Sequence, residues 1–214
     1  MFTQDRNLLT LEPSLFRDCS WLAQQLGRGE ARLESGHAIF ESGSINRDAA
    51  QPGMVLLVGR APLEITQIID EHDVVVSLLR PSLDADPIPP ADRSAAPAVC
   101  TTFTPQIALM HAQILAMLGL APRGTPNTLP DQLTEDHITN PHDLALLESL
   151  GALHLIFAGL AATTGPDSIA WQKADMYAKR TARERFRAQA KLDTDADGQP
   201  DVARRCAVIH LIRS

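Results

Sequence analysis

Hydrophobic positions change their spacing twice along the chain. Apolar residues recur every three to four positions near the start, alternate with polar residues in a middle segment, and return to helical spacing in the second half. The first spacing is typical of an amphipathic helix, and the alternation is typical of a strand with one buried face. We therefore expect an N-terminal helical segment at 1–35, with a short helix over 8–26 that ends at Gly27 and Gly29.

The middle segment, 36–81, has the composition of a small antiparallel β unit. Three runs rich in β-branched residues, at 54–58, 63–69 and 74–79, are separated by turn-forming residues. The polar tetrapeptide at 70–73 fits the tip of a hairpin. We expect a meander or partial barrel, followed by a Pro-rich linker at 82–101.

The second half is expected to hold three long helices. Thr104 and Asn140 each precede a proline, which is a typical start for a helix. The predicted helices are 105–118, 140–164 and 168–190, and they pack as a helical core at 102–214 with a C-terminal β-hairpin or strand. The predicted fold class is therefore mainly α, with the small β unit inserted in the N-terminal half.

Composition limits the functional classes. A net charge of −7 argues against a general nucleic-acid binder, which needs a basic surface. The three cysteines, Cys19, Cys100 and Cys206, fit neither a metal spacing nor a disulfide framework, so we expect buried free thiols in a reducing compartment. The start of the chain lacks the pattern of a signal peptide, and we expect no apolar segment to reach the length of a membrane span.

An Asp-rich run near the C-terminus has two interpretations. Asp193, Asp195, Asp197 and Asp201 occupy positions one, three, five and nine of a calcium loop, with Gly198 at position six. Such a loop needs a bidentate Glu at position twelve, where this chain has Arg204. The alternative is a tight acidic turn, since Asp and Gly favour turn conformations.

A basic stretch within 168–190 and just beyond it also has two interpretations. Its cations either contact DNA phosphates or form a solvated or subunit-facing surface that meets acidic residues of a neighbouring copy. They are Lys173, Lys179, Arg180, Arg183, Arg185, Arg187 and Lys191.

The pattern predicts no enzyme. His111 and His154 lie beside apolar helical stripes, where a histidine is more often a core or interface residue than a ligand. The chain shows no pairing of a nucleophile with a base and none of the common nucleotide-binding or metalloprotease motifs. An enzyme with an unrecognised site would instead bring perturbed carboxylates or histidines together in one deep pocket.

The second half of the chain resembles the head-to-tail connector proteins of tailed bacteriophages and prophages, also called adaptor or head-completion proteins. The order of the elements carries the resemblance: two helices, a long basic helix, an Asp-rich turn and an Arg-bearing end. The segments concerned are 102–108, 138–144, 150–156, 192–198 and 204–213.

The resemblance implies a structural virion protein that forms a ring, commonly of twelve copies, under the portal. DNA would pass through its lumen without sequence-specific binding, and the partners would be the portal and a tail-side connector or tail completion protein. The protein would lie in the neck of the virion, and in the host cytoplasm during assembly, with no membrane partner and no cofactor apart from calcium in the alternative interpretation.

The C-terminal segment would dock on the portal by adding a strand to it. The docking residues implied are Ala207, Val208, Ile209, His210, Leu211, Ile212 and Arg213.

Overall fold

The computed structural model describes residues 1–124 and 133–206, and its chain divides into two compact units. One unit is Gln4–Pro105, and the other combines Met1–Thr3 with Gln106–Ser214. The mainly-α prediction is wrong. Gln4–Pro105 contains a closed antiparallel barrel of six strands, and helices make up only about 38% of the chain while strands make up about 30%.

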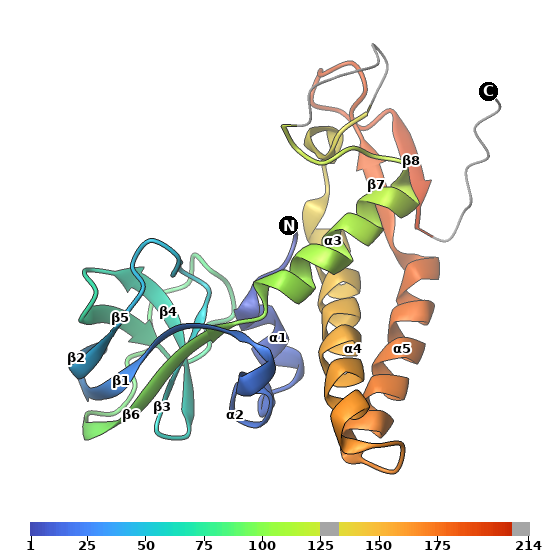
Figure 1. Ribbon diagram of the computed structural model, residues 1–214. Coiled ribbons are helices and arrows are strands. Elements are labelled where there is room, and N and C mark those ends of the chain that lie inside the picture. Colours follow the sequence, from blue (N-terminus) through green and yellow to red (C-terminus); the bar gives the residue numbers. More distant parts are fainter. Residues whose placement is uncertain (125–132, 207–214) are drawn as a thin grey trace. The chain divides into compact units, whose positions relative to one another are not determined.

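The barrel follows the order β1-β2-β5-β4-β3-β6 and closes where β6 pairs with β1 (Figure 1). Every neighbouring pair is antiparallel. The strands are β1 Gln24–Glu34, β2 His37–Ile45, β3 Val55–Val58, β4 Ala61–Ile68, β5 Asp73–Ser77 and β6 Arg93–Thr102.

Each strand contributes a pair of buried apolar residues, two positions apart, to the barrel core. Successive side chains of a strand point to opposite faces, so a spacing of two places both members inside. The pairs are Ala31 and Leu33, Ala38 and Phe40, Leu56 and Val58, Leu63 and Ile65, Val74 and Val76, and Ala98 and Cys100. The three runs expected to be strands, at 54–58, 63–69 and 74–79, correspond to β3, β4 and β5.

The glycines that were expected to end a helix lie inside β1. A Cβ on Gly29 would come within 1.9 Å of the Ser42 carbonyl oxygen, and one on Gly27 within 2.6 Å of the Ser44 carbonyl oxygen. The glycines therefore allow β1 and β2 to approach closely beside a β-bulge. The predicted helix over 8–26 is replaced by α1 Asp5–Leu11, α2 Leu15–Asp18 and the 3-10 turn η1 Ser20–Leu22.

Part of the segment expected to be a linker forms β6. Pro97 lies within this strand opposite Glu30, and its carbonyl oxygen accepts a hydrogen bond of 2.7 Å from the Gly59 amide. Proline has no amide to donate, yet it keeps its acceptor, so the strand tolerates it near a register shift.

A buried ion cluster joins α1 to the barrel. Glu64 is fully buried, and its Oε1 lies 2.9 Å from Arg6 Nε and 2.7 Å from Arg80 Nη2. Nearby, Asp5 Oδ1 accepts a 2.9 Å hydrogen bond from the Phe103 amide at the end of β6. These contacts fix the helical start of the unit to its last strand.

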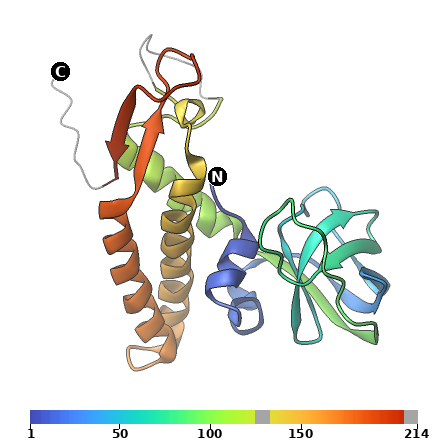
Figure 2. The same ribbon diagram turned by 180° about the vertical axis from the view of Figure 1, so that it is seen from behind.

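The second unit is built on α3 Thr104–Leu118, α4 Ala145–Thr164 and α5 Ile169–Arg187, with α4 and α5 side by side (Figure 2). Two 3-10 turns, η2 Glu135–His137 and η3 Pro141–Leu144, precede α4. A hairpin of β7 Gln189–Leu192 and β8 Val202–Arg205 follows α5. Thus β8 is a strand at 202–205, directly after the Asp-rich run.

Among the residues that the structure describes, one segment is long and apolar enough to cross a membrane, contrary to the expectation from the sequence. Pro141–Thr164 has a mean hydropathy of 1.8 in its most apolar window, and 61% of that window is buried inside the protein. A buried core helix meets the same criteria, and α4 packs against α5 with Phe157 stacked on Tyr177 at 5.6 Å. This segment therefore gives only weak evidence for a membrane.

Candidate functional site

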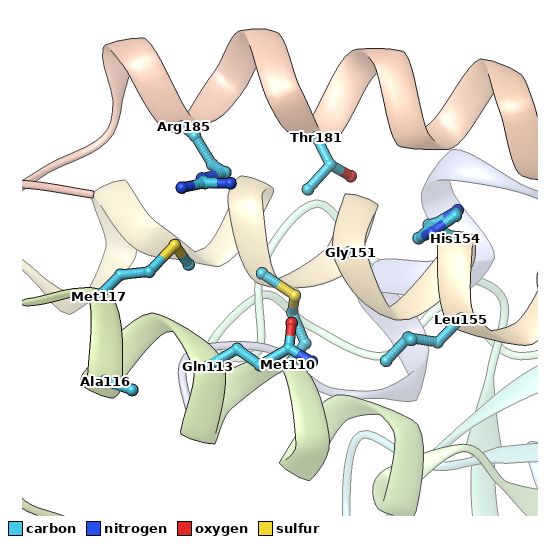
Figure 3. A pocket seen from close by; sticks show the side chains of 9 residues that line it. All are labelled: Met110, Gln113, Ala116, Met117, Gly151, His154, Leu155, Thr181 and Arg185. Atoms are coloured by element: carbon cyan, nitrogen blue, oxygen red, sulfur yellow. The ribbon is translucent and has the colours of Figure 1, made fainter. Parts of the chain in front are cut away.

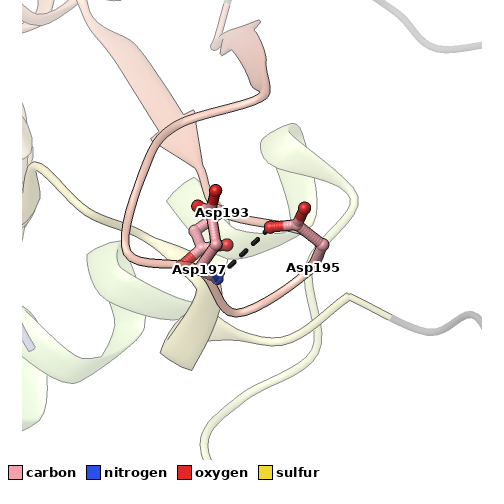
Figure 4. Close-up of side chains that lie close together, drawn as sticks. All are labelled: Asp193, Asp195 and Asp197. Carbon is pink, nitrogen blue, oxygen red and sulfur yellow. Dashed lines mark hydrogen bonds between the residues drawn. The ribbon is translucent and has the colours of Figure 1, made fainter.

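The Asp-rich run forms the loop between β7 and β8, and three of its carboxylates lie close together. One oxygen from each of Asp193, Asp195 and Asp197 lies within 4.8 Å of the others (Figure 4). Carboxylates so arranged are suitable ligands for a hard divalent cation. Of the four acidic residues singled out from the sequence, the fourth, Asp201, is not part of this group.

Hydrogen bonds to the backbone explain the shape of this loop without a metal. Asp193 accepts from the Ala196 and Gly198 amides, each at 2.8 Å, and both donors belong to residues with positive φ. Asp201 Oδ2 accepts from the amide and the hydroxyl of Thr194, and these bonds lower the pKa of Asp201. Asp195 and Asp197 each accept a hydrogen bond from the amide two residues further on, which is the pattern of an Asx turn.

Arg204 occupies the position where a calcium loop needs its bidentate carboxylate. Its Nη1 donates a 2.7 Å hydrogen bond to the Leu118 carbonyl oxygen at the C-terminus of α3. The last carbonyl groups of a helix have no partner within the helix, so a cation there is favourable. Arg204 therefore links β8 to α3 and supplies no metal ligand.

The segment expected to dock on the portal, Ala207 to Arg213, lies outside the described residues. Cys206 immediately precedes it and is buried in the main apolar cluster of the helical unit. Burial raises the pKa of the Cys206 thiol, although the positive charge of Arg185 acts in the opposite direction. All three cysteines are buried, and none forms a disulfide within the described residues.

The outer face of α5 combines exposed apolar side chains with cations. Ile169 is 73% exposed and Phe186 is 71% exposed, and Met176 is also exposed on this helix. Lys179 pairs with Asp175 at 2.6 Å, whereas no carboxylate of a described residue pairs with Arg183 or Arg187. An exposed apolar face bordered by unpaired cations is typical of a surface that a partner covers.

A groove with a volume of about 360 Å³ runs between α3 and α5, with α4 as its floor (Figure 3). Its lining is mainly apolar, and Gln113, His154, Thr181 and Arg185 add polar groups. The apolar lining comes from Met110, Ala116, Met117, Gly151 and Leu155. A Cβ on Gly151 would come within 2.2 Å of Met110 Sδ, so this glycine makes room for the methionine.

A second buried polar cluster lies in the same unit. Glu148 is fully buried, and it accepts hydrogen bonds from the Phe2 amide at 2.8 Å, the Thr3 amide at 2.6 Å and His111 Nδ1 at 2.7 Å. His111 Nε2 lies 3.3 Å from Glu135. Partial burial favours a higher pKa for Glu135, but His111 and the N-terminal amine outweigh it and lower the pKa.

Glu148 therefore holds Phe2 and Thr3 to the helices, and His111 binds Glu148. His154 lines the groove, where its Nδ1 donates to the Ala174 carbonyl oxygen at 3.1 Å. Within the described residues, neither histidine forms a hydrogen bond with a serine, threonine or cysteine side chain. The geometry gives no pairing of a nucleophile with a base at either place.

Comparisons with protein-family models, with curated proteins and with solved structures give no match. The groove was not predicted from the sequence, because its lining comes from three helices whose crossing is a tertiary property. One signal was present: Gly151 interrupts an apolar stripe, and a helical glycine is costly unless a neighbour fills its space.

Proposed function

We propose that the protein is a structural subunit of a homo-oligomeric ring, the head-to-tail connector that the sequence resembles. The observation that carries the proposal is the outer face of α5, where Ile169, Met176 and Phe186 are exposed beside arginines that pair with no carboxylate of a described residue. A face of this kind is suited to permanent contact with another subunit.

The charge distribution supports a contact between unlike surfaces. The chain carries 26 acidic and 19 basic residues, and the basic ones concentrate on α5. A basic face that meets an acidic face of the next copy makes a head-to-tail contact, and such contacts close into rings when the rotation permits. An overall negative protein also suits a conduit, since it repels DNA phosphates.

The proposal is tested by the number of copies of this protein in each virus particle. Particles of the source phage, or particles induced from the prophage, should contain this protein and the portal in the ratio of two stacked rings, measured by quantitative mass spectrometry. Phe186→Asp should remain folded and be lost from the particles, whereas the control Ile69→Asp, at an exposed barrel hairpin, should be retained. Absence from particles, or a ratio that fits no ring, would contradict the proposal.

A calcium-dependent binding module is the second candidate, favoured by the proximity of Asp193, Asp195 and Asp197. Arg204 argues against it, because it binds α3 where the loop needs a carboxylate. A rise in Tm on addition of calcium that Asp195→Ala abolishes, and that magnesium does not reproduce, would establish this candidate in place of the ring.

A further inference from the structure

We infer that the groove between α3 and α5 binds an aliphatic carboxylate, with the carboxylate on Arg185 and the alkyl chain on the apolar lining. The groove volume of about 360 Å³ lies in the range of pockets that bind small organic molecules, and such pockets combine an apolar lining with a few polar groups. The inference goes beyond the ring, since it concerns a site within one subunit.

The apolar lining determines the aliphatic part of the ligand. Met110 and Gly151 are buried, and Met117 and Leu155 are half-buried. Methionine side chains are flexible and polarizable, so they adapt to an alkyl chain. From Met110 to Met117 the groove follows α3 for about 10 Å. A lining of this length suits an extended alkyl chain better than a compact group.

Arg185 and Gln113 have side-chain donors available for a ligand. Neither side chain forms a hydrogen bond or an ion pair with another residue in the described part of the chain. The other polar groups of the lining are already engaged, because the Thr181 hydroxyl and His154 Nδ1 donate to backbone carbonyl oxygens at 2.8 Å and 3.1 Å. The unused donors favour acceptor atoms on the ligand.

The charge of the groove favours a ligand with a single negative charge. Among the described lining residues, only Arg185 is permanently charged, and its side chain points from α5 toward the end of the groove that Met117 lines (Figure 3). A planar guanidinium group matches a carboxylate through two parallel hydrogen bonds. A doubly charged phosphate would leave excess charge beside an apolar lining, which is unfavourable. The alkyl chain then extends toward Leu155 and His154.

A ligand at this place leaves the outer face of α5 free. Thr181 and Arg185 are four positions apart and share one face of the helix, whereas Phe186 is turned by about 100° from Arg185. Failure of ligand binding would therefore leave the ring proposal unchanged, and absence of a ring would leave the ligand site unchanged.

The methionine methyl groups provide the test. The full chain, labelled on these methyls, is titrated at pH 7.5 and followed by NMR, with octanoate and with octan-1-ol as the uncharged ligand of equal chain length. We expect Met110 and Met117 to shift saturably, while Met54 in the barrel and Met176 on the outer face of α5 do not shift. Octanol should bind about three- to fivefold more weakly, because an ion pair with an exposed arginine contributes modestly.

Variants at Arg185 separate its charge from the apolar contacts. This side chain is exposed, so its replacement leaves the helical core intact. Arg185→Gln should weaken octanoate binding about three- to fivefold and leave octanol binding unchanged. Arg185→Glu should make octylamine the preferred ligand, and the matched control Arg183→Gln should change neither affinity. Equal affinities for octanoate and octanol in the wild type would overturn the inference. Shifts that include Met54 and Met176, or no saturable shift at all, would overturn it as well.

Discussion

Asp5 is a buried carboxyl group, and its Oδ2 accepts no hydrogen bond from the described residues. Burial raises its pKa to about 6, although bonds from Thr102 and the Phe103 amide act in the opposite direction. The folded state therefore keeps a proton on Asp5 between about pH 4 and 6, where the unfolded state has lost it. By linkage, this group makes stability fall as the pH rises through that window.

We predict that Asp5→Asn removes this loss of folding stability at higher pH. The free energy of unfolding of the variant should equal that of the wild type near pH 4 and exceed it above pH 6. The excess should be at most about 3 kcal/mol, as expected for a shift of about two pKa units. Urea unfolding at pH 4.5 and pH 7.5 gives the free energy of unfolding of each protein. Subtracting the variant's value from the wild type's at each pH separates the contribution of Asp5 from that of the other titrating groups. A difference independent of pH would mean that Asp5 ionises normally.

Glu148 is a buried acceptor of three hydrogen bonds, and its removal should be costly. Glu148→Leu leaves the Phe2 amide, the Thr3 amide and His111 without their acceptor, so we expect a loss of about 3–5 kcal/mol. Glu148→Gln keeps an acceptor oxygen of the same shape and should cost less. Denaturation followed by circular dichroism at 222 nm reports on the helices, and equal losses in both variants would contradict this account.

At the scale of elements, the helices were easier to predict than the barrel. The capped starts at Thr104 and Asn140 and the apolar stripes are local signals, and α3 and α4 follow them closely. Barrel closure depends on pairing between 24–34 and 93–102, which are far apart in the chain. Gly29 and Pro97 act as breakers in a local interpretation, yet both lie inside strands because of their barrel neighbours.

The same substitution should have opposite effects in β1 and α4. Gly29→Ala forces a Cβ against the Ser42 carbonyl oxygen, and we expect a loss of about 1–3 kcal/mol or more. Gly159→Ala, in α4, meets no atom within 4 Å and should gain about 0.5–1 kcal/mol from reduced backbone freedom.

Thermal unfolding of the two variants provides the comparison. A neutral Gly29→Ala would mean that β1 and β2 do not approach closely at this glycine. A destabilised Gly159→Ala would mean that another surface covers this part of α4.

Among the candidate sites, the sequence indicated the ligand types of the Asp loop and the absence of its twelfth-position carboxylate. It did not indicate the contact that Arg204 makes instead, since α3 lies 86 residues earlier in the chain. The sequence also did not indicate that Phe186 is exposed, because the spacing of apolar residues along a helix does not show which of them are buried.

For the whole molecule, the salt dependence of self-association should distinguish the apolar contribution of α5 from its electrostatic contribution. The outer face of α5 offers aliphatic and aromatic contacts that salt does not weaken, and arginines whose attraction is screened over about 10 Å at 0.1 M. For subunits that associate as proposed, we expect the apparent dissociation constant to rise about tenfold between 0.1 M and 0.5 M sodium chloride, measured by sedimentation. Arg183→Ala should flatten this dependence, and an unchanged slope would remove the electrostatic part of the proposal.

The path of the chain makes the barrel an insert. Residues 1–3 belong to the helical unit, so the chain enters Gln4–Pro105 and leaves it again through two covalent links. The ends of this insert are adjacent, because Asp5 accepts a hydrogen bond from the Phe103 amide. A domain whose ends are adjacent can be replaced or deleted without stretching the segments on either side of it. Replacement or deletion of the barrel should therefore leave the connections between the helices unchanged.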